Sequence, residues 1–526
     1  MPLPAANTAW PPKELGPITA AMAAWDAWWV GDTDALERAY GGTAPVIRPG
    51  QMAGGVVGAV ARFFWGRPQV DLTQPRRKLH VPIATDICQA SADLLWSEAP
   101  DISVGDEKTQ QRLDELIDDQ ALQVFAEGAE IGAALGGHFL RVTWDDKLVP
   151  DRPFLTTVHA DAALPVFRWG RLVEVTFWSV VKRENQQVWR HLEHHALDSL
   201  GVGIVEHALF AGREDNLGTV VPLTDLAVTR GLVTAERPDG TVSTESPGLA
   251  VVYVPNQRPQ RRWRKDPLGQ HLGRSDLDAI EPMMDALDEV YSSWMRDIRL
   301  AKARLIVSDS ALQDQGPGKG AGFDLDREVF TGVNAPPTSL QGAAGGAFAQ
   351  AEQFAIRHEE HRATAQDLVE QILRTAGYSP STFGYGNDGA AATATEVQAR
   401  QQRSFQTRDR KLRNVRPAIS DVLEKLLAVD AAVFGTAGVK PERPDVEFPD
   451  GVQESLLSLA QTMQALRTAE AASTDTLVRM LHPEWDDTQV TEEVALIMGE
   501  QPAPLPDPTS PNLGAGTDVA PAQPVG

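Results

Sequence analysis

Basic side chains gather in one short stretch of an otherwise acidic chain. Between positions 400 and 416 one acid, Asp409, stands against seven basic residues, whereas the whole chain has a net charge of −24. Exposed arginines at this density are suited to binding phosphates or carboxylates. Six of these residues are the candidate contact residues: Arg400, Arg403, Arg408, Arg410, Lys411 and Arg413.

Three interpretations of this basic stretch remain open. It could line a nucleic-acid path and contact phosphates without reading the base sequence. It could form ion pairs with acidic faces of identical neighbouring chains, or it could be a solvated helix face. Because the rest of the chain is acidic, pairing between subunits is the favoured interpretation.

A loop rich in Gly and Ala, SPSTFGYGNDGAAATAT, leads directly into the basic stretch. Such a loop is most often a linker. Its aromatic residues and its position between two expected long helices instead favour a mobile functional loop. Its candidate functional residues are Phe383, Gly384, Tyr385, Gly386, Asn387 and Gly389.

The other candidate chemical groups do not form an active site. His358 and His361 are three residues apart, as metal ligands on a helix can be, but no third ligand has a suitable spacing. The run 316–320 lacks the spacing of a phosphate-binding loop. The acidic pairs at 145–146 and 324–326 have no supporting groups around them. We therefore expect neither an enzyme nor a protein with a cofactor or metal site.

Length and composition indicate several folded regions and no membrane segment. A chain of 526 residues is too long for a single compact core. Cys88, the single cysteine, is predicted to be a small core residue. The most apolar run, 52–65, contains Arg62 and is shorter than the roughly 20 residues that span a bilayer. The start of the chain lacks the features of a secretion signal.

The N-terminal half is predicted to contain helices followed by antiparallel strands. Apolar spacing predicts helices over 18–40 with a break at Gly31, over 82–97, and over 110–134 with a stop at Gly136. Short runs rich in Val, Phe, Trp and Thr then predict an antiparallel meander and a final strand. These runs are 138–144, 163–168, 171–182, 187–192, 204–210 and 249–254.

The C-terminal half is predicted to be mainly helical, so the fold class is α+β with helix predominant. Ser275 and Asp278 could cap a helix reaching residue 302, which Pro282 either kinks or begins. A strand, a Gly-rich turn and a second strand are expected over 303–330. Further helices are expected over 348–376, over the basic stretch to 426 with an interruption or bend at Pro417, and over 453–498. The tail 501–526, rich in proline, is expected to be disordered.

Several long stretches resemble the portal proteins of tailed bacteriophages, particularly long-tailed phages of actinobacteria. The most distinctive is AGYSPSTFGYGNDGAAATATEVQARQQRSFQTRDRKLRNVRPAI at 376–419. The others are KLHVPIATDICQASADLLWSEAPDI at 78–102, FRWGRLVEVTFW at 167–178, LAVVYVPN at 249–256 and LGRSDLDAIEPMMDALDEVYSSWMRDIRLAKARLIV at 272–307. Together they span most of residues 15–435.

The resemblance implies an architecture of wing, stem, clip and crown regions. Residues 1–255 would form the wing, 256–302 the first stem helix, 303–347 the clip and 348–377 the second stem helix. Residues 378–392 would form the tunnel loop, 393–440 the long wing helix, 441–500 a crown-like helical region and 501–526 the disordered tail. In such a protein the loop would narrow the channel, and the arginines of the following helix would mainly hold subunits together.

The resemblance also implies a structural role in the virion. Portal subunits form a homo-oligomeric ring, usually of about twelve copies, at one capsid vertex. The ring passes double-stranded DNA during packaging and ejection, and it contacts terminase, the head–tail adaptor, the major capsid protein and scaffolding protein. Assembly would take place in the host cytoplasm. The alternative is another ring-forming head–tail adaptor or capsid structural protein.

Overall fold

The computed structural model contains two compact units, which are considered separately. The first comprises Met1–Ala392 and Glu396–Gly451, and the second Thr393–Thr395 and Val452–Gly526. The structure describes residues 3–40, 78–145, 147–233, 240–300, 304–307, 313–314, 321–322, 349–352, 356–385, 394–436, 438–449, 456–469, 471–482, 485 and 487–500. Several features of the sequence lie outside these residues: the run 316–320, the acidic pair at 324–326, Asp146 and the tail 501–526.

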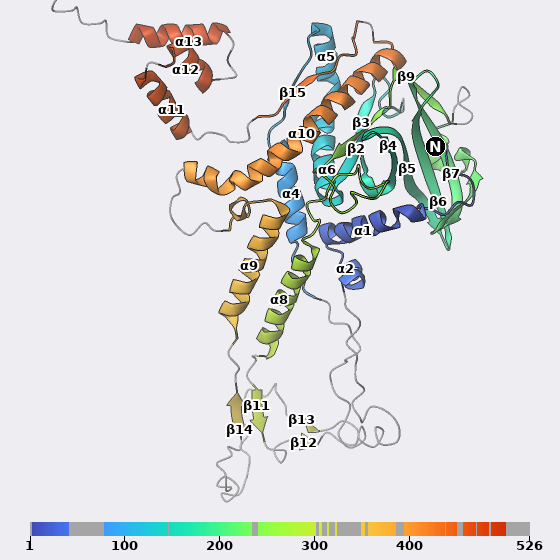
Figure 1. Ribbon diagram of the computed structural model, residues 1–526, viewed down its shortest axis with the longest axis vertical. Helices are drawn as coiled ribbons and strands as arrows, with labels where there is room; N and C mark the ends of the chain where they lie inside the picture. The colour runs from blue at the N-terminus through green and yellow to red at the C-terminus, as the bar shows by residue number, and fades with distance from the viewer. Residues whose placement is uncertain are drawn as a thin grey trace, which may run out of the picture. The chain divides into compact units, whose positions relative to one another are not determined.

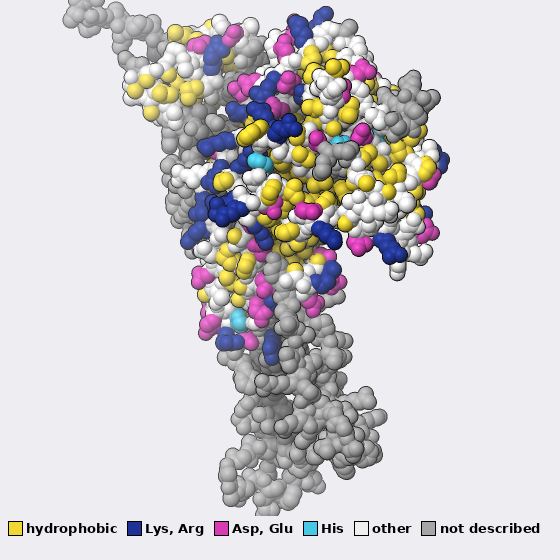
Figure 2. Space-filling model, turned by 45° about the vertical axis from the view of Figure 1, so that its right-hand side comes forward, with side chains coloured by type: hydrophobic (Ala, Val, Ile, Leu, Met, Phe, Trp, Pro, Cys, Tyr) yellow, Lys and Arg dark blue, Asp and Glu magenta, His cyan; other side chains and the backbone are white. Residues whose placement is uncertain are grey.

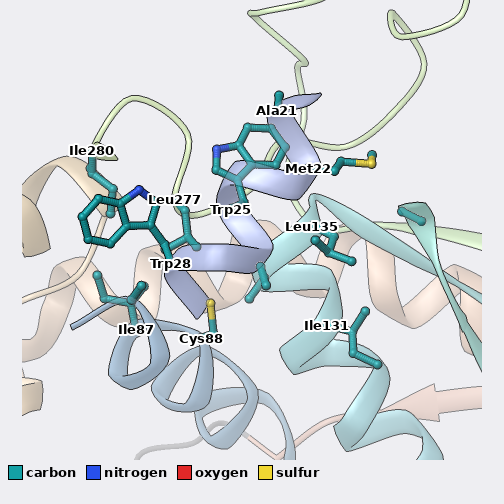
Figure 3. Close-up of a cluster of buried hydrophobic side chains, with 14 of the residues drawn as sticks. Ala21, Met22, Trp25, Trp28, Ile87, Cys88, Ile131, Leu135, Leu277 and Ile280 are labelled. Carbon is teal, nitrogen blue, oxygen red and sulfur yellow. The ribbon is translucent and has the colours of Figure 1, made fainter. Parts of the chain in front are cut away.

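Several N-terminal helices of the first unit pack around one apolar core. They are α1 (Gly16–Val30), α2 (Thr33–Tyr40), α4 (Ile83–Trp96) and α6 (Asp119–Leu135). The buried residues of α5 (Glu107–Leu116) belong to a second cluster. Trp25 and Trp28 of α1 are fully buried. Figure 3 shows the side chains of α1, α4 and α6 directed toward one another, with Cys88 among them. Cys88 is buried, which confirms its predicted place in the core.

Two of the predicted helix boundaries are explained by local capping. The helix expected over 110–134 is two helices, because Asp118 accepts a hydrogen bond from the Ala121 amide and begins α6. The stop at Gly136 is confirmed: this residue has φ +90°, and an added Cβ would lie 2.7 Å from the Gly273 carbonyl oxygen. The backbone after α6 therefore requires glycine.

A six-stranded antiparallel sheet contains most of the predicted meander. Its order is β4-β5-β6-β7-β8, with β9 paired to β7. The turn Trp169–Gly170 joins β4 to β5, as predicted, and both residues have positive φ. The strands are β4 (Ala163–Arg168), β5 (Arg171–Glu184), β6 (Gln187–Leu197), β7 (Val202–Arg213), β8 (Asn216–Val221) and β9 (Val242–Pro247).

The first predicted strand of the meander belongs to a separate sheet. β2 (Gly137–Thr143) lies between β10 (Val251–Pro255) and β3 (Phe154–His159) in a three-stranded antiparallel sheet. β1 (Asp101–Ser103) pairs with the distant β15 (Asp445–Glu447). A second apolar cluster joins α5 and α6 to β2, β3, β10 and the C-terminal half of α10 (Ala394–Val433).

Two long helices, α8 (Glu281–Leu300) and α9 (His358–Ala376), lie side by side (Figure 1). The capping prediction for α8 was wrong: the Ser275 hydroxyl donates to the Ala134 carbonyl 2.6 Å away, and the helix begins six residues later. Pro282 therefore lies in the first turn of α8. The prediction of helix from 348 was also wrong, because β14 (Ala349–Glu352) pairs there with β11 (Arg304–Val307).

The remaining elements follow the predicted outline in part. Between the two long helices, β12 (Gln313–Asp314) pairs with β13 (Ala321–Gly322). α10 runs through Pro417 without interruption and ends at Val433, beyond the expected 426. In the first unit a single-turn helix, α7 (Ala227–Arg230), precedes β9. The second unit contains α11 (Leu456–Thr468), α12 (Thr474–Leu481) and α13 (Asp487–Glu500).

Candidate channel loop and basic helix

The start of the Gly/Ala loop is fastened to α10 by hydroxyl groups. α9 ends at Gly377, whose φ is +104°, and the Thr407 hydroxyl donates to its carbonyl over 2.6 Å. The Ser404 hydroxyl accepts from the Ser379 amide at 2.9 Å and lies 2.7 Å from the Thr382 hydroxyl. Two neighbouring turns of α10 therefore hold the chain as it leaves α9.

The described part of the candidate loop is anchored at one end and open at the other. Phe383 packs against the first apolar core, with its ring centroid 6.1 Å from that of Tyr378 in an edge-on arrangement. Gly384 has φ +79° and no atom within 4 Å of the position of a Cβ. Tyr385 is exposed. Gly386, Asn387 and Gly389 lie outside the described residues.

The basic residues of α10 divide into an exposed and a buried set. Arg403, Arg410 and Arg413 are exposed, whereas Arg408 and Lys411 are 5% and 2% exposed. Arg400 lies on α10, and its side chain is outside the described set. Figure 2 shows Lys and Arg side chains gathered along one side of the molecule, where α10 lies in Figure 1. Arg408 and Lys411 are thus interior groups of this chain.

Lys411 forms a buried ion pair with Asp276, and several segments meet there. The ammonium group also donates to the Ser91 hydroxyl of α4. The second oxygen of the same Asp276 carboxylate accepts from the side-chain amides of Asn256 and Gln257 at 2.9 and 2.6 Å. An ion pair in the interior persists only when such additional hydrogen bonds replace lost hydration. Asp276 therefore fixes α10 against α4 and the end of β10.

The rest of this network involves a tyrosine and an arginine. The Tyr378 hydroxyl donates to Asp276 over 2.7 Å, and burial raises the pKa of Tyr378 well above its usual value. Arg408 donates to the Leu94 carbonyl at 2.7 Å and to the Pro449 carbonyl. The segments on either side of the loop, α9 and α10, are therefore joined to a common interior network.

The contacts of Asp276, Tyr378, Ser404 and Thr407 were not predicted from the sequence. One signal was available for the buried residues of α10. The apolar residues Val415, Ile419 and Val422 lie on one helix face, and steps of three and four residues backward from 415 reach 411, 408 and 404. The periodicity thus assigns Lys411 and Arg408 to the buried face despite their charge.

The histidines that the sequence offers as metal ligands have other partners in the structure. His361 Nε2 lies 3.0 Å from Asp297 of α8, and the His358 ring contacts Trp294 edge-on. Arg357 also pairs with Asp297, and these two partners lower the pKa of that carboxyl. No group of three or more potential metal ligands occurs within the described ranges. The contacts to Asp297 join the far end of α8 to the start of α9.

A second set of histidines lies on the six-stranded sheet. His191 Nε2 and His207 Nδ1 are 3.1 Å apart, and Glu193 lies between His195 and Arg141. Burial lowers the pKa of His207 to about 4, with Glu193 opposing and His191, His195 and Arg141 adding to the shift. The ion pair of Arg141 on β2 with Glu193 on β6 thereby links the three-stranded sheet to the six-stranded sheet.

Comparison with known proteins identifies the family of the chain. Among the described helices none is long and apolar enough to cross a membrane. No curated protein matches the chain significantly. The family model for the phage portal protein, SPP1 Gp6-like, matches residues 22–501, which is nearly the whole chain. The chain therefore belongs to the SPP1 Gp6-like family of phage portal proteins.

Proposed function

We propose that copies of this chain form a ring at one vertex of a phage capsid, through which double-stranded DNA is packaged and ejected. The family match over residues 22–501 carries this proposal. The ring would have about twelve subunits joined by heterologous contacts. Such contacts produce a closed ring when the rotation from one subunit to the next is a whole fraction of a full turn. It would also dock terminase and the head–tail connector, and contact the major capsid and scaffolding proteins. Host cytoplasmic assembly of the virion belongs to the same proposal.

The paired helices α8 and α9 support the assignment of a stem. They pack against each other along their length, and Asp297 joins the end of α8 to the start of α9 through Arg357 and His361. The chain between them therefore leaves and returns at the same end of the pair. We assign 256–302 and 348–377 to the stem and 303–347 to the clip, the surface for terminase and connector.

The loop at 378–392 is proposed as the narrowest part of the channel. Its start is held by Ser404 and Thr407, whereas Gly384 has open space around it. A loop fastened at its base can move with the DNA while α10 stays in place. Contact with the duplex would then be to its backbone and independent of base sequence.

The exposed arginines of α10 are proposed to face a neighbouring subunit or the DNA. Among the candidate residues whose side chains the structure describes, Arg403, Arg410 and Arg413 are exposed. The proposal rests on these three. The division into a wing over 1–255 and 393–440, and a crown-like region over 441–500, completes the assignment.

The mass and symmetry of the purified protein test this function. Native mass spectrometry and negative-stain imaging should show a closed ring with a central hole. A protein that stays monomeric at micromolar concentration and low salt, and remains so with capsid and scaffolding protein, would contradict the proposal. A closed ring of different symmetry would contradict the subunit number alone.

A further inference from the structure

The segment between β10 and α8 presents basic side chains from a firmly anchored backbone. Trp263 is buried at 5% exposure, and the Gln260 side chain donates to the Gly273 carbonyl over 2.8 Å. Between and beside these anchors the basic residues are exposed: Arg258, Arg261, Arg262, Arg264 and Lys265. The positions of these cations are therefore set by the fold.

This segment lies directly against α10. The Arg274 amide donates to the Gln257 carbonyl at 2.8 Å, and the Asn256 side chain donates to the Arg274 carbonyl at 2.9 Å. Asn414 of α10 in turn donates to the Asn256 carbonyl at 3.4 Å. Arg410 precedes Asn414 by one helical turn, on the same face. Arg410 is thereby brought toward Arg274.

Arg261, Arg274 and Arg410 together form what we call the arginine cluster. Burial lowers the pKa of Arg274, and the nearby charges of Arg261 and Arg410 lower it further, while Asp276 and Asp278 oppose the shift. Three guanidinium groups from two elements, distant in sequence, therefore repel one another within a small region.

The acids nearest the arginine cluster are already engaged. Both oxygens of Asp276 accept hydrogen bonds, from Lys411 among others, and Asp278 pairs with Arg262 at 3.4 Å. Within the described part of the chain no carboxylate lies at ion-pair distance from Arg261, Arg274 or Arg410. The chain has 72 acids and 48 basic residues, so a group of arginines that lacks carboxylate partners among the described residues is unexpected. The Arg274 guanidinium donates instead to the Gln257 side-chain oxygen.

We propose that the arginine cluster is a docking surface for carboxylates of a second copy of this chain. The inference rests on the proposed ring and names the partner of its basic face. A chain with a net charge of −24 has an excess of carboxylates. Guanidinium groups bind a carboxylate in a forked geometry through two parallel hydrogen bonds. The phosphates of DNA would fit the same guanidinium groups. Cations that the fold keeps in place would, however, slow a duplex that has to slide through the ring.

Assembly of charge variants tests the inference. In the triple variant Arg261→Gln, Arg274→Gln, Arg410→Gln, the protein concentration at half-assembly should rise at least about tenfold, and its salt dependence should weaken. The matched control Arg183→Gln, Arg213→Gln, Arg230→Gln removes three exposed arginines of the first unit outside the cluster and should assemble as wild type. Sedimentation velocity at about 0.05 and 0.5 M NaCl measures both effects.

A second variant separates assembly from folding. Arg261→Glu with Arg410→Glu changes only exposed side chains and keeps the half-buried Arg274. It should have the thermal unfolding midpoint of wild type and assemble still more weakly than the triple variant. Normal assembly of both variants would overturn the inference and leave the proposed function intact. A wild-type chain that never forms rings would instead contradict the proposed function.

Chemical crosslinking identifies the partner group. In Arg261→Lys with Arg410→Lys, a carbodiimide activates a neighbouring carboxylate, which the lysine amine attacks to form an amide with net loss of water. Rings assembled from a mixture of ¹⁵N-labelled and unlabelled chains should contain mixed-label crosslinks to Asp or Glu. Exclusively same-label crosslinks would overturn the inference. Duplex DNA binding that the triple variant loses while its rings form normally would assign the arginine cluster to phosphate instead.

Discussion

At the residue scale, the ion pair of Lys411 and Asp276 shows how a basic helix can serve the interior. Asp276 is fully engaged by Lys411, Tyr378, Asn256 and Gln257. Removing one charge from a buried pair leaves the other without compensation, which costs more than the pair contributes. The alkyl stem of Lys411 meanwhile contacts its surroundings as an apolar group would.

Lys411→Met is therefore expected to lower the free energy of unfolding by about 3–5 kcal/mol, because the Asp276 carboxylate loses its cation. Urea denaturation followed by tryptophan fluorescence measures the change. Arg413→Met, on the exposed face of the same helix, is the control and should change stability by less than about 0.5 kcal/mol. Equal effects of the two substitutions would contradict a buried pair.

The buried His207 predicts acid sensitivity of the first unit. Its pKa is about 4 when folded, against 6.5 for the unfolded group. Between these values the unfolded chain binds more protons, so this contribution is complete above pH 6.5 and is lost as pH falls toward 4. The unfolding free energy should fall by about 2 kcal/mol between pH 7 and 5 from this group.

His207→Gln keeps a hydrogen-bonding side chain beside His191 and removes the titration. Its unfolding free energy should change less between pH 7 and 5 than that of wild type, in the same urea experiment. Glu193 does not mask the effect, because the pKa of its carboxyl lies below the usual range and the group stays ionised at both pH values. An unchanged pH slope in the variant would contradict the assignment.

At the element scale, side-chain hydrogen bonds join the end of α9 and the start of the loop to α10. The sequence predicted both helices and the end of α9 at 376, because periodicity and glycine are local signals. It did not predict that Ser404 and Thr407 fasten the loop, or that Arg408 and Lys411 are interior groups. Those contacts join residues distant in sequence, from 25 positions for Ser404 and Ser379 to 320 positions for Lys411 and Ser91.

The strands show the same division between local and distant information. The hairpins of the meander were predicted because each turn lies between its two strands. The placement of β2 between β3 and β10, and of β15 beside β1, joins segments separated by up to several hundred residues. No turn sequence specifies such a pairing, so the strand order could not be predicted from local sequence.

Shortening the loop between Gly384 and Ala392 should leave ring formation intact and reduce the amount of packaged DNA. The reason is that the anchors at Ser379 and Thr382 precede the deletion, whereas the proposed contact with the duplex lies within it. Particles assembled with the variant would be compared for ring mass and DNA content. Loss of the ring would assign the loop a structural role.

At the scale of the whole molecule, the two units predict separable stability. Apart from Thr393–Thr395, the second unit begins at Val452, beyond β15 and the Pro449 carbonyl that accepts from Arg408. A chain ending at Gly451 should therefore retain the denaturation midpoint of the first unit, within about 0.5 kcal/mol in unfolding free energy. Ending the chain at 444 removes β15 and should destabilise that unit, which provides the comparison.

The interior network around Asp276 also has a consequence for synthesis of the chain. Ser91 and Lys411 are 320 residues apart, and Lys411 is translated 135 residues after Asp276. During translation, Asp276 therefore lacks its cationic partner, Lys411, until α10 has been synthesised. The first unit can close only late in translation, as contacts this distant require. Under the proposed function, a fragment released before α10 is synthesised would lack this joint and should not assemble with complete subunits.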